Sequence, residues 1–258
     1  MRTLFKAALA SLLLAACAST PAAPPEPQGD LDGWIIKFAG HPLGENLHNT
    51  FSVRDGVIHV SYDGYEKLDG QFGHLFYPEP FSHYRLRFEY RFIGEQVAGG
   101  PTWGLRNNGV MIHSQPPETM TIDQPFPTSV EVQVLGSDGV TPRTTANVCT
   151  PGVSILPDGV RSEEHCFNSA APSPPPGEWA SIEVEVHGNR LIRHIVNNQV
   201  VMEYSEPMLD EDSPWSPTRA PQQRLSGVPS GEPSDGNPQC RDHGARRVAL
   251  TPRAHAPG

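Results

Sequence analysis

The sequence lacks the short motifs of several large enzyme classes. It contains no GxSxG, no HExxH, no P-loop and no dinucleotide fingerprint after a predicted strand. Serine hydrolases, zinc proteases and nucleotide-dependent enzymes are therefore excluded. The segment "GGPTWG" (99–104) is glycine-rich, but it contains proline and opens no helix, which argues against a phosphate-binding role.

Helical periodicity is also missing, because no stretch sustains it beyond two turns. The chain of 258 residues has 28 prolines and 24 glycines, which interrupt helical hydrogen bonding and favour turns. Alternation of apolar and polar residues recurs instead, between clusters of Gly, Pro and Asn. The sequence therefore predicts an all-β fold, a sandwich of two antiparallel sheets.

Three segments carry the clearest alternation, and two dipeptides mark hairpin turns. The residues expected to face the core are Leu86, Phe88, Tyr90 and Phe92, then Val130, Val132 and Val134, then Ile182, Val184 and Val186. Asp55-Gly56 and Asn197-Asn198 offer the left-handed backbone of a tight hairpin. Glu183, Glu185 and His187 are expected on a plain exposed face. The long segments 116–128 and 136–177 are expected to be loops, the usual places for binding residues, with disorder as the alternative.

Runs of charge of one sign are absent. The formal net charge is −10 and it is spread along the chain. We therefore expect no binding to nucleic acid or to anionic lipid.

The single long apolar run lies at the N-terminus. Arg2 and Lys6 precede residues 7–16, which are apolar, and Cys17 follows small residues. This pattern predicts an export signal over residues 1–16 and not a membrane span. The letters "LAAC" resemble the bacterial lipobox, which implies lipid attachment at Cys17, and Ala18 points to the outer membrane of the cell envelope. An ordinary soluble export signal is the alternative. Residues 17–30 read as an extended Pro/Ala tether.

Cysteine is scarce, with four residues in the whole chain. An exported protein meets an oxidising compartment, so Cys149 and Cys166 are expected to form a disulfide. The lower entropy of the cross-linked unfolded chain corresponds to about 3 kcal/mol of stabilisation. No CxxC or nearby HxxxH spacing completes a metal site around this pair. Cys240 is left over.

A cluster of polar side chains is the candidate site. It comprises Arg106, Asn107, Asn108, His113, Gln115, Glu118, Glu131 and Gln133, with Trp103 just before. Carboxylate, imidazole, amide and indole groups together are typical of a sugar site, because hydroxyl groups need fixed partners and sugar rings stack on aromatics. Glu131 and Gln133 should project from one strand face about 7 Å apart. A solvated strand face is the alternative for Glu131, and a structural histidine for His113.

Several segments resemble the 3-keto-disaccharide hydrolase domain family in order and spacing. They are "NNGVMIHSQ", "VEVQVLG" and "PGEWASIEVEVHGNRLIRHIVNNQVV", and the resemblance covers residues 32–207. Asn108 stands where the family usually has Ser, Ala180 where it has Asn, and Asn198 where it has Gly. The first difference concerns a substrate contact and the others concern turns.

The resemblance implies a concanavalin-like jelly roll with a ligand groove on its concave sheet, and a carbohydrate as partner. It also implies cleavage of 3-keto-glycosides, in which a base removes the proton at C2 and the C1 substituent leaves before water adds. Glu131 and His113 are then the candidates for base or metal ligand. Substrate contacts fall to Gln133, Asn107, Asn108, Trp103, Gln115 and Glu118. An oxygen-rich site with one imidazole suits Ca²⁺ or Mn²⁺. A lectin-like module that binds sugar without cutting it is the alternative.

The C-terminal part of the chain departs from this pattern. Family members usually end with two further strands, but residues 228–258 are rich in Pro, Gly and Arg without alternation. We therefore expect one sandwich domain over residues 31–227, with its last strands missing, and an irregular tail. The break at Gly227 suggests a change of reading frame, with natural divergence as the competing account; resequencing around this codon tests it.

Overall fold

The computed structural model describes residues 31–162, 164–215 and 241–251, the last segment by its backbone. The predicted signal peptide, the tether, Cys17 and Cys240 lie outside the described residues. Among the residues described, no helix has the length and apolar character needed to cross a bilayer.

The larger sheet has eight strands in the order β10-β15-β14-β13-β5-β16-β3-β2. The bounds are β2 Phe51–Arg54, β3 Val57–Ser61, β5 His83–Phe92, β10 Val153–Pro157, β13 Ala180–His187, β14 Leu191–Val196, β15 Gln199–Leu209 and β16 Arg241–Thr251. All pairings are antiparallel except those of β16, which runs parallel to both of its neighbours, β3 and β5. The predicted two-sheet, mainly antiparallel all-β architecture is confirmed.

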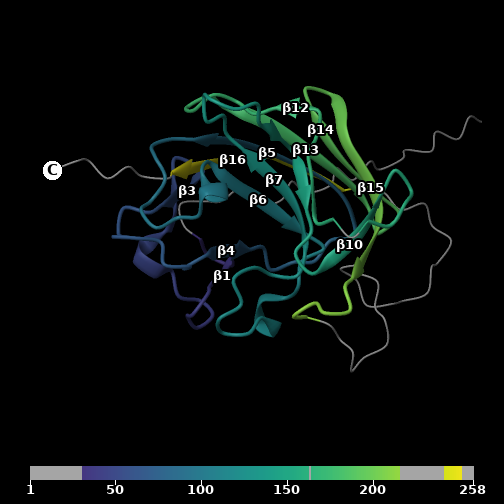
Figure 1. The fold of residues 1–258 in the computed structure, drawn as a ribbon. Helices are drawn as coiled ribbons and strands as arrows, with labels where there is room; N and C mark the ends of the chain where they lie inside the picture. The colour runs from purple at the N-terminus through teal and green to yellow at the C-terminus, as the bar shows by residue number, and fades with distance from the viewer. Residues whose placement is uncertain (1–30, 163, 216–240, 252–258) are drawn as a thin grey trace, which may run out of the picture.

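The second sheet has four strands in the order β11-β9-β7-β6 and lies in front of β5 and β13 in Figure 1. Its strands are β6 Asn107–Ile112, β7 Val130–Leu135, β9 Asn147–Cys149 and β11 Cys166–Phe167. Two short pairs complete the strands, β1 Ile35–Phe38 with β4 Gly73–Phe76 and β8 Thr144–Thr145 with β12 Ala171–Pro172. Three 3₁₀ turns are η1 Leu47–Asn49, η2 Thr102–Gly104 and η3 Pro117–Thr119.

The core lies between the two sheets and consists of the residues that the alternation predicts. Val130, Val132, Ile182, Val184 and Val186 have no exposed surface. Burying a valine or isoleucine side chain contributes roughly 1.5–3 kcal/mol relative to leaving it in water. This packing fixes the register of β7, so that its even-numbered residues face inward and its odd-numbered residues face the other way.

A buried histidine joins the two sheets. His194 of β14 has no exposed surface, and its Nδ1 donates to the Ala146 carbonyl at 2.8 Å. Its Nε2 lies 2.9 Å from the Tyr204 hydroxyl and accepts its hydrogen. Burial lowers the pKa of His194 to about 4, so the ring is neutral at pH 7.

Both hairpin turns follow the prediction. Asp55 and Gly56 have φ of 52° and 71°, and Asn197 and Asn198 have φ of 51° and 61°. Two successive left-handed residues match the twist of the flanking strands, which is why these dipeptides close β2–β3 and β14–β15.

The outer face of β13 is more buried than the sequence predicts, and ion pairs cross it. Glu183 pairs with Arg85 of β5 at 3.2 Å, and Glu185 lies 2.6 Å from His187 Nε2. The side chains of Glu183 and Glu185 are 19% and 15% exposed, because facing residues of β5 cover them. The face is therefore a half-buried ladder of ion pairs across strands.

The predicted loop 136–177 contains five short strands, from β8 to β12. A disulfide joins Cys149 to Cys166 at a Cα distance of 4.2 Å, which confirms the predicted pair. Four of them have only two or three residues, too few for a readable alternation, and β10 has five.

The prediction that the tail is irregular throughout is wrong for residues 241–251, which form β16. This strand lies between β3 and β5, and its backbone pairs with Ile58–Ser61 on one side and with residues 84–92 on the other. Facing strand edges need partners for their backbone groups, and this need outweighs a composition poor in strand formers. The reading-frame hypothesis stays a prediction.

Candidate functional site

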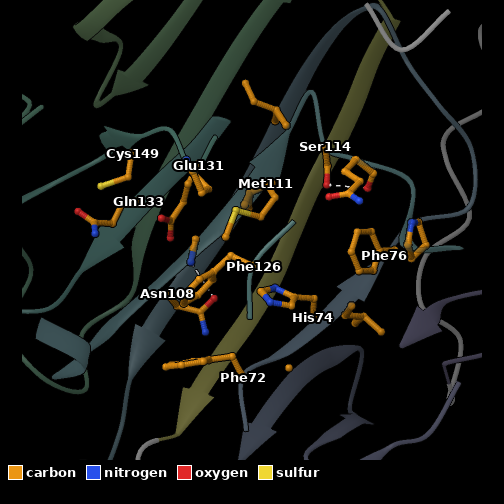
Figure 2. Close-up of a pocket in the computed structure, with 18 of the residues that line it drawn as sticks. Phe72, His74, Phe76, Asn108, Met111, Ser114, Phe126, Glu131, Gln133 and Cys149 are labelled. Carbon is orange, nitrogen blue, oxygen red and sulfur yellow. Dashed lines mark hydrogen bonds between the residues drawn. The ribbon is translucent and has the colours of Figure 1, made fainter. Parts of the chain in front are cut away.

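A cavity of about 1260 Å³ lies between β4 and β6. Every residue of these two strands lines it. Among the described strands, β4 pairs only with β1 and β6 only with β7, so each has an open edge. The cavity wall also includes Glu131 and Gln133 of β7. Figure 2 shows these two side chains with Met111, which stands opposite Glu131 in the sheet. The predicted polar face of β7 is therefore the wall of a cavity and not a plain wet surface.

The alternation of β7 positions Glu131. Because Val130 and Val132 are fixed in the core, Glu131 projects from the opposite face. In the register of the sheet, Glu131 stands between Met111 of β6 and Cys149 of β9. Both neighbours bear sulfur and offer little polarity, and within the described residues the Glu131 carboxyl accepts no hydrogen bond. Burial raises the pKa of Glu131 to about 8.

Gly109 leaves the space that Glu131 occupies. A Cβ atom at position 109 would stand 2.3 Å from Glu131 Oε1 and 2.5 Å from its Cγ. Any other residue at this position would force the carboxyl group to move. The glycine in "NNGVM" therefore serves the site, a role that the sequence does not reveal.

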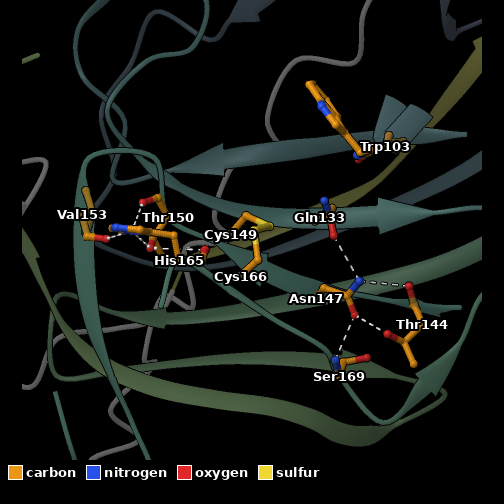
Figure 3. The surroundings of a disulfide bond; sticks show 11 residues. Trp103, Gln133, Thr144, Asn147, Cys149, Thr150, Val153, His165, Cys166 and Ser169 are labelled. Carbon is orange, nitrogen blue, oxygen red and sulfur yellow. Dashed lines mark hydrogen bonds between the residues drawn. A yellow bond between two sulfur atoms is a disulfide. The ribbon is translucent and has the colours of Figure 1, made fainter. Parts of the chain in front are cut away.

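Gln133 is oriented by a residue that sequence reasoning missed, Asn147 of β9. Asn147 Nδ2 donates to Gln133 Oε1 at 3.1 Å, so the Gln133 amide nitrogen is turned toward the cavity (Figure 3). Asn147 is itself held, because its Oδ1 accepts from Ser169 N at 2.9 Å and from Thr144 Oγ1 at 2.7 Å. Its Nδ2 also donates to the Thr144 carbonyl at 3.0 Å. The result is a fixed N–H donor two residues from Glu131.

The geometry of this site agrees with a match to a known family. A family model described as the 3-keto-alpha-glucoside-1,2-lyase-like domain matches residues 27–244. The chain belongs to this family. The match confirms the resemblance drawn from the motifs and places the chain among carbohydrate-related domains. Neither a curated protein nor a solved structure matches the chain.

His113, the second predicted catalytic residue of this 3-keto-alpha-glucoside-1,2-lyase-like domain, lies just after β6 and bonds to the β13–β14 turn. It follows β6 with φ of 50°, and its Nε2 donates to the Gly188 carbonyl of the β13–β14 turn at 3.1 Å. Its Nδ1 is buried without a partner among the described residues. Burial lowers the pKa of His113 to about 4, so the ring is neutral. No hydrogen bond in the described part of the chain joins His113 to Glu131, although both line the cavity.

Asn107 and Asn108 border the site on β6. Asn107 Nδ2 donates to the Trp103 carbonyl at 2.9 Å, which ties η2 to the strand. Asn108 Oδ1 accepts from Gly109 N at 2.8 Å, which directs the Asn108 amide nitrogen away from the backbone. Asn108 pairs with Val134 of β7, whose side chain lies in the core, so the Asn108 side chain leaves β6 on the face opposite to Glu131.

The remaining predicted residues lie at the margin of the cavity. Glu118 is exposed on η3, whereas Gln115 is 1% exposed and its Oε1 accepts from Gln124 at 2.7 Å. Arg106 donates to the Ser137 carbonyl at 2.9 Å, which indicates a role in holding loops together. The sequence cluster therefore divides into residues beside Glu131 and residues that support the surrounding loops.

The residues of this family member do not assemble an evident cation site. No group of three or more His, Cys, Asp or Glu side chains gathers within the described ranges. The Gln133 oxygen is occupied by Asn147, and His113 Nε2 by Gly188. The Ca²⁺ or Mn²⁺ expected from the sequence therefore stays a prediction.

Aromatic side chains from three distant segments meet at one end of the cavity, and only one was predicted. Phe72 stacks on Trp103 with ring centroids 5.8 Å apart and an angle of 19°. Phe126 lies 4.8 Å from Phe72, and His74 lies 5.7 Å from Phe126. Positions 72, 103 and 126 share no sequence motif, so only the fold brings them together.

Proposed function

We propose that this domain cleaves 3-keto-glycosides by elimination across C1 and C2, followed by addition of water. The observation that supports it is a buried carboxyl group, Glu131, with the oriented amide of Gln133 on the same strand face and a pKa raised to about 8. The description of the matched family names a 1,2-lyase of 3-keto-alpha-glucosides, which agrees with this chemistry.

In the first step Glu131 is the general base. Its carboxylate takes the proton from C2, which is acidic because it adjoins the C3 carbonyl, and the C2–H electron pair forms an enolate. Gln133 Nε2 donates a hydrogen bond to the enolate oxygen. Donors fixed in advance in a water-poor site stabilise such charge at little reorganisation cost.

In the second step the enolate expels the C1 substituent. The enolate pair forms the C1–C2 double bond, the C1–O bond breaks, and the departing oxygen takes the proton held by Glu131. Glu131 then accepts a proton from water as the oxygen of that water adds to C1 and a proton returns to C2. The sum is hydrolysis, and one carboxyl group serves both steps, unlike the paired carboxylates of a conventional glycosidase.

The raised pKa suits this role. A carboxylate whose conjugate acid has a pKa of about 8 is a stronger base than an ordinary glutamate, and catalytic groups work best with pKa values near the working pH. No step is assigned to a cation. Incubation with EDTA should therefore leave turnover unchanged, and its loss with recovery on adding Ca²⁺ or Mn²⁺ would overturn this part.

Release of the leaving group from a 3-keto-glucoside by the purified protein tests the proposal. Glu131→Gln should keep the fold and lose at least a hundredfold in kcat, whereas exposed Glu178→Gln, remote from the cavity, is the matched control. Binding of the compound without turnover would instead support the lectin-like alternative. Turnover undiminished in Glu131→Gln would refute the mechanism.

We also propose that the protein is a lipid-anchored component of the bacterial cell envelope. The supporting pattern is the apolar run followed by "LAAC". Mass spectrometry of the mature N-terminus should find cleavage before Cys17 and acyl chains on it, and an unmodified N-terminus would refute the anchor.

A further inference from the structure

The aromatic cluster at the end of the cavity consists of Phe72, His74, Trp103 and Phe126. All four residues line the same cavity as Glu131 and Gln133. Figure 2 shows Asn108 between the Glu131 side of the cavity and Phe72. The cluster therefore lines the same cavity as the proposed catalytic site.

Trp103 presents a free ring surface in this cluster. One side of its indole stacks on Phe72, yet 55% of the residue remains exposed. Its position is fixed, because its carbonyl accepts from Asn107 and the Gln96 side chain donates to the Pro101 carbonyl at 2.6 Å. A large apolar surface left in water on a fixed backbone is costly unless a ligand covers it.

The neighbouring lining shows what kind of group would fit. Leu68, Val97 and Pro101 line the cavity here without side-chain donors or acceptors, and Gln96 lines it too, with its Nε2 already donating to the Pro101 carbonyl. The polar side chains Glu131 and Gln133 line the cavity from one face of β7. A sugar ring needs fixed partners for its hydroxyl groups, whereas a planar aromatic ring needs only apolar surface and stacking partners.

We propose that this aromatic cluster binds an aromatic leaving group attached at C1 of the sugar. The sugar ring then lies along the polar face of β7 with C2 near Glu131, and the aglycone ring stacks on Trp103. The proposal rests on the proposed function for the direction of the substrate, and it names the substrate class as aryl 3-keto-glycosides.

The test compares phenyl and methyl 3-keto-glucosides of the same anomeric form. Stacking between aromatic rings contributes about 0.5–1.5 kcal/mol, which corresponds to roughly two- to tenfold. Trp103→Ala should therefore lower kcat/KM for the phenyl compound two- to tenfold more than for the methyl compound. Trp103→Phe should retain most of the preference. Trp179→Ala removes a second partly exposed tryptophan that does not line the cavity and should leave both values unchanged.

Equilibrium binding separates this proposal from the proposed function. Calorimetry in the Glu131→Gln background measures Kd for both compounds without turnover. A preference for the phenyl compound that disappears with Trp103→Ala supports the subsite, even where the wild-type protein turns over neither compound. Turnover with equal Kd values for both compounds refutes the subsite and leaves the proposed function standing. An equal loss for both compounds in Trp103→Ala also refutes it, because it indicates a structural role only.

Discussion

The carboxyl group of Glu131 lies over Gly109, with no room for a single carbon between them. A methyl group at position 109 would overlap Glu131 Oε1, from which it would be 2.3 Å away. The edge strand β6 is therefore complementary in shape to the proposed base on β7. The carboxyl group keeps its position because residue 109 has no Cβ atom.

Gly109→Ala is expected to abolish turnover while the sandwich still folds. The added methyl group displaces Glu131, and misplacement of a catalytic group by about 1 Å can cost about a hundredfold in rate. The double variant with Glu131→Ala separates the effects, because Gly109→Ala should cost less stability in that background. Equal costs in urea unfolding with and without Glu131 would contradict the contact.

The pH dependence of turnover should report the pKa of Glu131. Only the carboxylate accepts the C2 proton, so kcat/KM is expected to rise with pH and level off above about pH 8. A plateau already reached at pH 5 would show that the base has an ordinary pKa.

Glu131 should make the free energy of unfolding fall as pH rises, whereas it should make turnover rise. The pKa of Glu131 is raised in the folded state, so between pH 4.5 and about 8 the folded protein holds a proton that the unfolded chain has lost. The stability associated with this group is therefore lost as pH rises through that window. Glu131→Gln should be more stable than wild type at pH 8, by about 2–4 kcal/mol, and similar to it at pH 4.5. Urea unfolding at both values measures the difference, with Glu178→Gln as control.

Acid should destabilise the protein through its buried neutral histidines. Burial lowers the pKa of His194 and of His113 to about 4. The stability that the two neutral rings contribute to the fold is therefore fully present above pH 6.5 and is lost as pH falls from 6.5 through 4. Each shift corresponds to about 3 kcal/mol at most. Replacing His194 with Gln should flatten the loss between pH 6.5 and 4, which thermal unfolding at stepped pH would show. An unchanged slope would mean that this ring is not kept neutral by the fold.

Asn147→Asp is expected to lower kcat about a hundredfold without unfolding the protein. A carboxylate oxygen in place of Nδ2 would repel Gln133 Oε1 and turn the Gln133 amide, so that its oxygen faces the cavity. Loss of one donor to an oxyanion costs about a hundredfold or more in kcat. The measurement is kcat of Asn147→Asp beside that of Gln133→Ala. If the two variants lower kcat by clearly different factors, Asn147 does not act through Gln133.

The sequence predicts those strands in which apolar and polar residues alternate within one continuous stretch. Val130, Val132 and Val134 alternate with polar residues, and burial on one side of the sheet is sufficient reason for that pattern. Glu131 and Gln133 could be predicted as site residues because they share the other face. Asp55-Gly56 carries its turn geometry in its own backbone preference.

Other parts of the site depend on contacts between distant segments, which one sequence does not display. Phe72 and Phe126 join Trp103 only because β4 lies beside β6. Asn147 meets Gln133 through the register of β7 with β9, a strand of three residues. The bond from His113 to Gly188 is another such contact, and the catalytic role suggested by the residue type of His113 stays a prediction.

The position of β16 has a consequence for biosynthesis. The β2–β3 hairpin is made early, yet it reaches the rest of the larger sheet only through a strand that spans residues 241–251. The chain cannot close this sheet until residues 241–251 are available. The exposed edges of β3 and β5 must meanwhile be shielded, for example by a chaperone, or they will pair with other chains.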